Sequence, residues 1–147
     1  MRLEGTTHIN APRDKVWTFL MDPALIKDCA PGLQSLDVIE PNKKFRAVAS
    51  VGFGSVKATF NTDIEFVEMV PPNRAKVKAH GRAPGSAVDA LAEMNLSDAA
   101  DGTTSMKWTA DVTVVGTIAS LASRLMGSVT QKLTNEFFTC VKKKVEA

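Results

Sequence analysis

A two-residue alternation of apolar and polar side chains recurs in segment after segment between residues 56 and 115. In the clearest run, residues 56–66, the even positions are Val, Ala, Phe, Thr, Ile and Phe, and the odd positions are Lys, Thr, Asn, Asp and Glu. Successive side chains of a strand point to opposite faces, so this alternation predicts strands with one apolar and one hydrated face. Such strands are typical of an antiparallel sheet that is covered on one side.

The same pattern, with turn residues in the gaps, predicts seven strands. Their expected ranges are residues 3–9, 33–39, 44–51, 56–67, 74–80, 87–96 and 104–115. Segments such as Pro71-Pro72-Asn73 and Ala100-Asp101-Gly102 supply the backbone geometry that a chain reversal needs. Connections this short imply that consecutive strands are antiparallel neighbours.

Helical spacing appears only near the two ends of the chain. Residues 13–21 carry apolar side chains at helical spacing, with Asn10 as the expected N-cap, and a second short helix is expected over residues 24–29. A final helix is expected from Thr117, its cap, to about Lys144, and it is long enough to cross a sheet. We find no linker, repeat or low-complexity segment, so residues 1–147 are interpreted as one α+β domain.

Charge and hydropathy exclude several classes of protein. The chain has 18 Lys and Arg against 16 Asp and Glu, a net charge of +2, so electrostatics nominates no nucleic acid partner. No segment approaches the ~20 apolar residues that span a bilayer, and residues 1–5 lack the apolar core of a secretory signal, so a cytoplasmic location is expected. Cys29 and Cys140 stand far apart without metal-ligand spacing, and we expect two reduced thiols rather than a disulfide.

Small side chains dominate the apolar face of the strands. The alanines assigned to it are Ala47, Ala49, Ala58, Ala75, Ala79, Ala90, Ala92 and Ala110. They have two interpretations: either they let the last helix sit close on the sheet in a solid core, or they leave space between helix and sheet for a ligand. If a ligand binds there, the apolar face and the last helix predict its contacts. These residues are Phe60, Thr62, Ile64, Val77, Ala90, Ala92, Met94, Trp108, Ala110, Leu121, Leu125, Met126 and Val129.

Candidates for catalysis are few. The alternation places His8 and His80 on the hydrated side, and it places no charged residue on the apolar face of the four strands between Val56 and Val114. Opposite charges on the hydrated face are expected to pair across strands. We find no phosphate loop, zinc spacing or dinucleotide signature, so no catalytic, metal or cofactor site is predicted.

Several motifs, taken in order along the chain, resemble one family. They are Ala11-Pro12 followed by Val16-Trp17 and Asp22-Pro23, the segments 29–36 (CAPGLQSL) and 51–60 (VGFGSVKATF), Pro71-Pro72, Gly102-Thr103-Thr104, Gly116, Leu125 and Glu136-Phe137-Phe138. Together they resemble the CoxG family of carbon monoxide dehydrogenase, within the START-like helix-grip (SRPBCC) superfamily. The resemblance covers nearly the whole chain. It implies a helix-grip fold, in which a curved seven-stranded antiparallel sheet wraps around the long C-terminal helix, with two short helices after the first strand.

The resemblance also implies a non-enzymatic accessory protein with an apolar cavity. Its expected ligand is a hydrophobic small molecule of the quinone or lipid class, and its expected partner is a carbon monoxide dehydrogenase-type molybdenum hydroxylase, which it would help to mature, recruit to the membrane or couple to quinones. Peripheral contact with the cytoplasmic membrane would use Lys142, Lys143 and Lys144.

Two other functions remain open at this point. An enzyme of the polyketide cyclase or aromatase kind would need polar groups inside the cavity, and the alternation places almost none there. A protein-interaction module with a solid core would dock through residues 117–131, where Arg124 is the only charged side chain.

Overall fold

Seven antiparallel strands form one sheet in the order β1-β7-β6-β5-β4-β3-β2 in the computed structural model, which describes residues 1–146. The strands are β1 (Arg2–Ile9), β2 (Leu33–Glu40), β3 (Lys44–Phe53), β4 (Val56–Val70), β5 (Arg74–Ala83), β6 (Ser86–Asp98) and β7 (Thr104–Gly116). Strands β2 to β7 follow one another across the sheet, and β1 pairs with β7 at its far edge. All seven expected strands are present.

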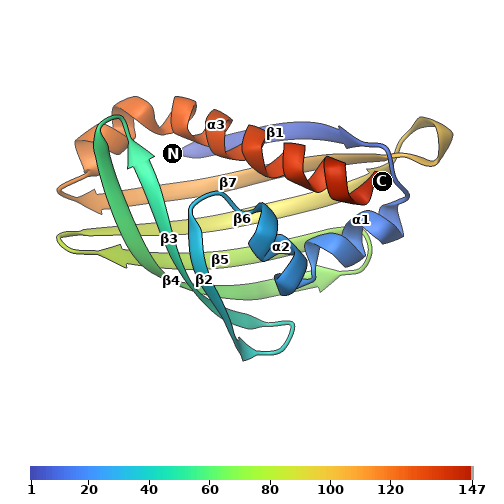
Figure 1. Ribbon diagram of the computed structural model, residues 1–147, viewed down its shortest axis with the longest axis horizontal. Coiled ribbons are helices and arrows are strands. Elements are labelled where there is room, and N and C mark those ends of the chain that lie inside the picture. The colour runs from blue at the N-terminus through green and yellow to red at the C-terminus, as the bar shows by residue number, and fades with distance from the viewer. Residues whose placement is uncertain (147) are drawn as a thin grey trace.

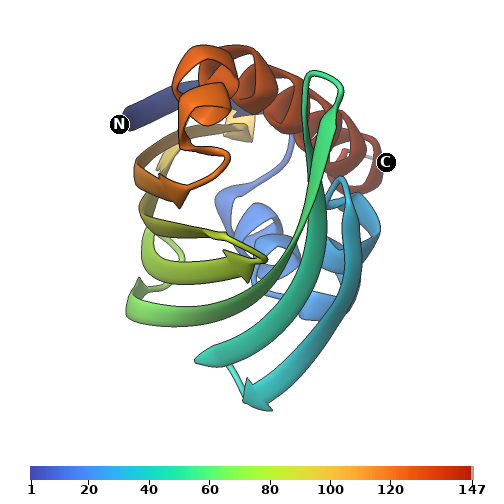
Figure 2. The ribbon, with the colours of Figure 1, turned by 90° about the vertical axis from the view of Figure 1, so that its left-hand side faces the viewer.

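A long helix lies across the concave side of this sheet. The helices are α1 (Arg13–Leu20), α2 (Pro23–Cys29), the 3-10 turn η1 (Ala100–Gly102) and α3 (Ala119–Val145). Figure 1 shows α1 and α2 at one end of the sheet, near the C-terminal half of α3. Seen from the end, in Figure 2, the sheet curls into an open cup with α3 across its top. This arrangement confirms the expected fold, a curved seven-stranded sheet gripping a C-terminal helix.

Neither expected helix cap is formed. Pro12 and Ile118 are the N-cap residues of α1 and α3, and neither makes a side-chain capping bond. The backbone N–H of Asn10 donates instead to Glu146 Oε2 at 2.8 Å. The Thr117 hydroxyl lies 3.1 Å from the Ser86 hydroxyl. The prediction was wrong because both residues find partners that lie far away in the sequence.

The convex face of the sheet carries the charged side chains, as predicted. Opposite charges pair across strands, for example Arg46 with Asp63 at 3.1 Å. His80 Nδ1 lies 2.6 Å from Asp89 Oδ1 on this face. These side chains are exposed, and such pairs contribute less than about 1 kcal/mol each.

The apolar core consists of two separate clusters. One lies where α1, α2 and the end of α3 meet the sheet, and its fully buried members include Ile9, Val16 and Val141. The other lies beneath the start of α3 and contains Phe53, Phe60, Ile118, Ala122 and Met126. Between the clusters, inner-face residues of β4 to β7 are only half-buried. The middle of the sheet is therefore not fully covered by side chains of α3.

A disulfide joins Cys29 at the end of α2 to Cys140 of α3, with their Cα atoms 5.3 Å apart. The expectation of two reduced thiols was therefore wrong. The residues are 111 positions apart, and only the packing of α2 beside α3 brings them together. Structural disulfides are typical of oxidising compartments, so this bond weighs against the cytoplasmic expectation.

Breaking the Cys29–Cys140 bond is expected to lower the free energy of unfolding by about 2–4 kcal/mol, because a cross-link over a long loop restricts the unfolded chain. Urea unfolding with and without dithiothreitol measures this difference. The control is Cys140→Ser, which should unfold alike under both conditions. Equal stability of the oxidised and reduced wild type would contradict the prediction.

Gly127 lies in the middle of α3, and a Cβ added there meets no atom within 4 Å. Glycine in a helix interior costs roughly 0.5–1 kcal/mol relative to alanine. We therefore expect Gly127→Ala to raise the free energy of unfolding by about that amount in thermal or urea unfolding. A loss of stability would show that the space beside Gly127 is closed.

Candidate functional site

An apolar cavity of about 270 Å³ lies between the short helices, the inner face of the sheet and α3. Its lining residues are Leu20, Met21, Ile26, Phe66, Ala75, Val77, Ala92, Glu93, Met94, Met106, Trp108, Thr109 and Phe137. A second cavity of about 150 Å³ adjoins it and shares four of these residues. The volume of the first lies near the lower end of the range usual for small-molecule sites.

Small residues on two central strands create this space. Ala75 of β5 is opposite Met94 of β6, and Val77 is opposite Ala92. Because side chains of directly opposed residues lie close together on one face, the alanines leave the floor of the cavity low. The cavity thus occurs where the alanine pattern leaves room, and this observation favours the ligand interpretation over the solid core.

The chemistry of the lining is almost wholly apolar. Within the described residues, Glu93 is the one charged member, and it belongs to the convex-face positions of β6. Its carboxylate lies 3.1 Å from Arg74 Nε. The cavity therefore offers hydrophobic contact and shape, and its lining presents no free acid or base from Glu93 to a bound molecule.

The predicted lining residues fall into three groups. Val77, Ala92, Met94 and Trp108 line the 270 Å³ cavity, and Ile64 lines its neighbour. The residues in the core cluster under the start of α3 are Phe60, Leu121, Leu125, Met126 and Val129. The half-buried inner-face residues outside both cavity linings are Thr62, Ala90 and Ala110.

The sequence analysis missed the wall that α1 and α2 provide. Leu20, Met21 and Ile26 line both cavities. The apolar spacing of the first helix did point to a buried face, but the sequence does not show which part of the sheet that face meets. Phe137, an expected member of the α3 stripe, completes the wall from above.

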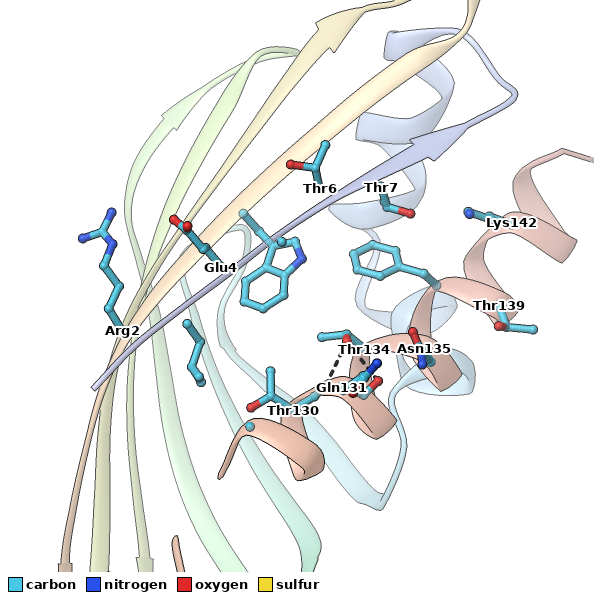
Figure 3. Close-up of a pocket in the computed structure, with 15 residues that line it drawn as sticks. Arg2, Glu4, Thr6, Thr7, Thr130, Gln131, Thr134, Asn135, Thr139 and Lys142 are labelled. Atoms are coloured by element: carbon cyan, nitrogen blue, oxygen red, sulfur yellow. Dashed lines mark hydrogen bonds between the residues drawn. The ribbon is translucent and has the colours of Figure 1, made fainter. Parts of the chain in front are cut away.

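A second hollow, which we call the β1–α3 groove, measures about 470 Å³. Its lining residues are Arg2, Leu3, Glu4, Gly5, Thr6, Thr7, Trp108, Gly127, Thr130, Gln131, Thr134, Asn135, Phe138, Thr139 and Lys142. Figure 3 shows its polar side chains on β1 and α3. The sequence analysis did not predict this groove, because it assigned no partner to the polar side of the last helix.

Gly5 and Trp108 face each other across β1 and β7. A Cβ added at Gly5 would lie 2.8 Å from three atoms of the indole, including Nε1. The ring therefore lies directly against the backbone of β1, which only a residue without a side chain permits.

Neither metal binding nor membrane spanning is supported by the part of the chain that the structure describes. No group of three or more His, Cys, Asp or Glu side chains in residues 1–146 is placed to hold a metal ion. Over the same residues, no helix combines the length and apolarity needed to cross a bilayer.

A long helix across the concave face of a seven-stranded antiparallel sheet, with an apolar cavity beneath it, defines a helix-grip protein. The model of the CoxG family, the G-type subunit of carbon monoxide dehydrogenase, matches residues 5–146, so the chain belongs to that family. This confirms the resemblance seen in the sequence motifs.

Solved structures of other proteins share the fold. A conserved protein from Geobacillus kaustophilus is 27% identical, with a TM-score of 0.91 over 99% of this chain and 95% of its own. Zhui aromatase/cyclase from Streptomyces sp. R1128 is 16% identical, with a TM-score of 0.76 over 99% of this chain and 93% of its own. A comparison with curated proteins finds no match.

Gly5→Ala is expected to displace the Trp108 indole and to cost about 1–3 kcal/mol, as overpacking does. Fluorescence of a Trp17→Phe background, in which Trp108 is the remaining tryptophan, reports the displacement, and urea unfolding gives the cost. Gly52→Ala is the matched control, because a Cβ there meets nothing within 4 Å. An unchanged Trp108 emission spectrum in Gly5→Ala would contradict the close approach.

Proposed function

We propose that this protein is a non-enzymatic carrier or adaptor that holds a hydrophobic small molecule of the quinone or lipid class between the sheet and α3. It would serve as an accessory to a carbon monoxide dehydrogenase-type molybdenum hydroxylase, in maturation, membrane recruitment or coupling to quinones. The observation that carries the proposal is the 270 Å³ cavity, whose lining is apolar apart from Thr109 and the paired Glu93.

Hydrophobic burial supplies the binding energy in this proposal. A ligand that buries about 300 Å² of apolar surface gains roughly 7–8 kcal/mol at about 25 cal/mol per Å². The loss of translational and rotational freedom opposes this gain. A preformed cavity limits the further cost of ordering the protein, so an apolar molecule of moderate size suits this site.

An enzyme of the cyclase or aromatase kind is the second candidate. General acid–base catalysis needs a titratable group within hydrogen-bond reach of the reacting atoms. The charged residue of the cavity lining, Glu93, faces the convex side and pairs with Arg74, which favours binding over catalysis. A module with a solid core is also less favoured, because two adjoining cavities interrupt the core.

The location and the membrane contact are further parts of the proposal. Lys144 lies 3.5 Å from Asp28, and Lys142 lines the β1–α3 groove, so Lys143 is the member of the lysine run that is exposed outside these contacts. Lys142, Lys143 and Lys144 would therefore give a weak and transient contact with an anionic membrane surface. A cytoplasmic place, free or peripheral at the membrane, is proposed with it.

Native mass spectrometry of protein purified from its own host, followed by organic extraction, tests the carrier role directly. We expect an added mass that organic extraction removes and that is recovered as a hydrophobic compound. A bare chain, together with failure to bind the apolar dye N-phenyl-1-naphthylamine, would overturn the proposal.

Filling the cavity should abolish dye binding. Ala92→Phe adds a ring to the cavity floor, and we expect the dissociation constant of N-phenyl-1-naphthylamine to rise by about tenfold or more, which is about 1.4 kcal/mol. Ala87→Phe introduces the same side chain at a convex-face position of the same strand and should leave binding within about twofold. Unchanged dye affinity in Ala92→Phe would place the dye elsewhere and contradict the cavity site.

A further inference from the structure

We propose that the β1–α3 groove binds the polar end of the same ligand, and that this end is an uncharged hydrogen-bond acceptor such as a carbonyl. The inference rests on the proposed function, because it assumes that the apolar part of the ligand occupies the cavity. It adds a second, chemically different site and restricts the ligand to amphipathic molecules.

The two hollows meet at one residue. Trp108 lines both the apolar cavity and the β1–α3 groove, and it is the residue that their linings share among residues 1–146. It is half-buried, so its ring is open to both sides. A molecule that fills the cavity and extends past this ring therefore enters the groove.

The indole of Trp108 offers a hydrogen-bond donor at this border. Its Nε1 lies against Gly5, and its N–H forms no hydrogen bond with any other group of residues 1–146. An indole N–H only donates, so it suits an acceptor on the ligand. Apolar contact on one side of the ring and a donor on its edge match a molecule with both characters.

Neutral polar side chains occupy the centre of the groove. Gln131 and Asn135 are one helical turn apart on α3, and Thr7 lies on β1 across from them (Figure 3). Each amide has two N–H donors. Figure 3 also shows Arg2 and Glu4 directed away from α3, and Arg2 pairs with Asp111 at 3.6 Å. The centre of the groove thus recognises hydrogen-bonding atoms rather than a charge.

Two consecutive aromatic residues of α3 continue this division. Phe137 lines the apolar cavity, and Phe138 lines the groove. Their rings are in contact, with centroids 5.1 Å apart and planes at 75°. Together with Trp108 they provide an aromatic passage between the hollows, against which the middle of an extended ligand would lie.

The test compares two probes that differ only in the polar end. The probes are 2-prenyl-1,4-naphthoquinone and 2-prenylnaphthalene, each measured by displacement of N-phenyl-1-naphthylamine. Wild type should bind the quinone about tenfold or more tightly than the hydrocarbon, because two or three hydrogen bonds each contribute about threefold to tenfold. In the double variant Gln131→Ala with Asn135→Ala, this preference should fall to within about threefold, with the affinity for the hydrocarbon unchanged.

The matched control is Lys132→Ala with Glu136→Ala. It has the same spacing on the same helix and lies outside the groove lining, and it should keep the full preference. Alanine favours helix, so neither double variant threatens the fold. Trp108→Phe keeps the aromatic ring and removes the donor, and it should lower the preference by about threefold to tenfold.

Two results would overturn the inference. One is a wild type without preference for the quinone, and the other is a preference that survives in Gln131→Ala with Asn135→Ala. Both leave the cavity site intact as long as the hydrocarbon still displaces the dye. Failure of both probes and the dye to bind wild type would instead overturn the proposed function itself.

Discussion

One helix must cover the apolar face of seven strands, and it is too narrow to do so. An α-helix with its side chains is about 10–12 Å wide, whereas strands spaced by about 4.8 Å make a seven-stranded sheet about 29 Å across. The sheet responds by curling, so that its edges approach α3 while its middle stays apart (Figure 2). Helices α1 and α2 fill one end of the remaining space, and the cavity is what they leave open.

The alternation of side chains was sufficient to predict the strands, their faces and the position of the long helix. Its success has a physical cause, because a slip by one residue would turn every apolar side chain of a strand to water. What failed depends on contacts between distant segments. The partners of Asn10 and Thr117, the Cys29–Cys140 bond and the wall formed by Met21 and Ile26 all require packing that no local pattern records.

The candidate site was predicted in part for the same reason. Val77, Ala92, Met94 and Trp108 lie on the sheet, where alternation assigns a side chain to a face. Leu121 and Leu125 were placed on the correct side of the helix, but they pack in the core near its start rather than over the cavity. The position of a side chain along α3 relative to the strands depends on the tilt of the helix, and periodicity alone does not define that tilt.

The disulfide between α2 and α3 divides the chain topologically. Residues 29–140 form a closed covalent ring that contains β2 to β7, while β1, α1 and most of α2 lie outside it. On the side of α2, the gap beneath α3 is limited by Cα atoms 5.3 Å apart, whereas no disulfide within residues 1–146 crosses from β1 to α3. Because β1 is held in the sheet by β7 alone, it is the wall of the molecule that can separate without breaking the ring.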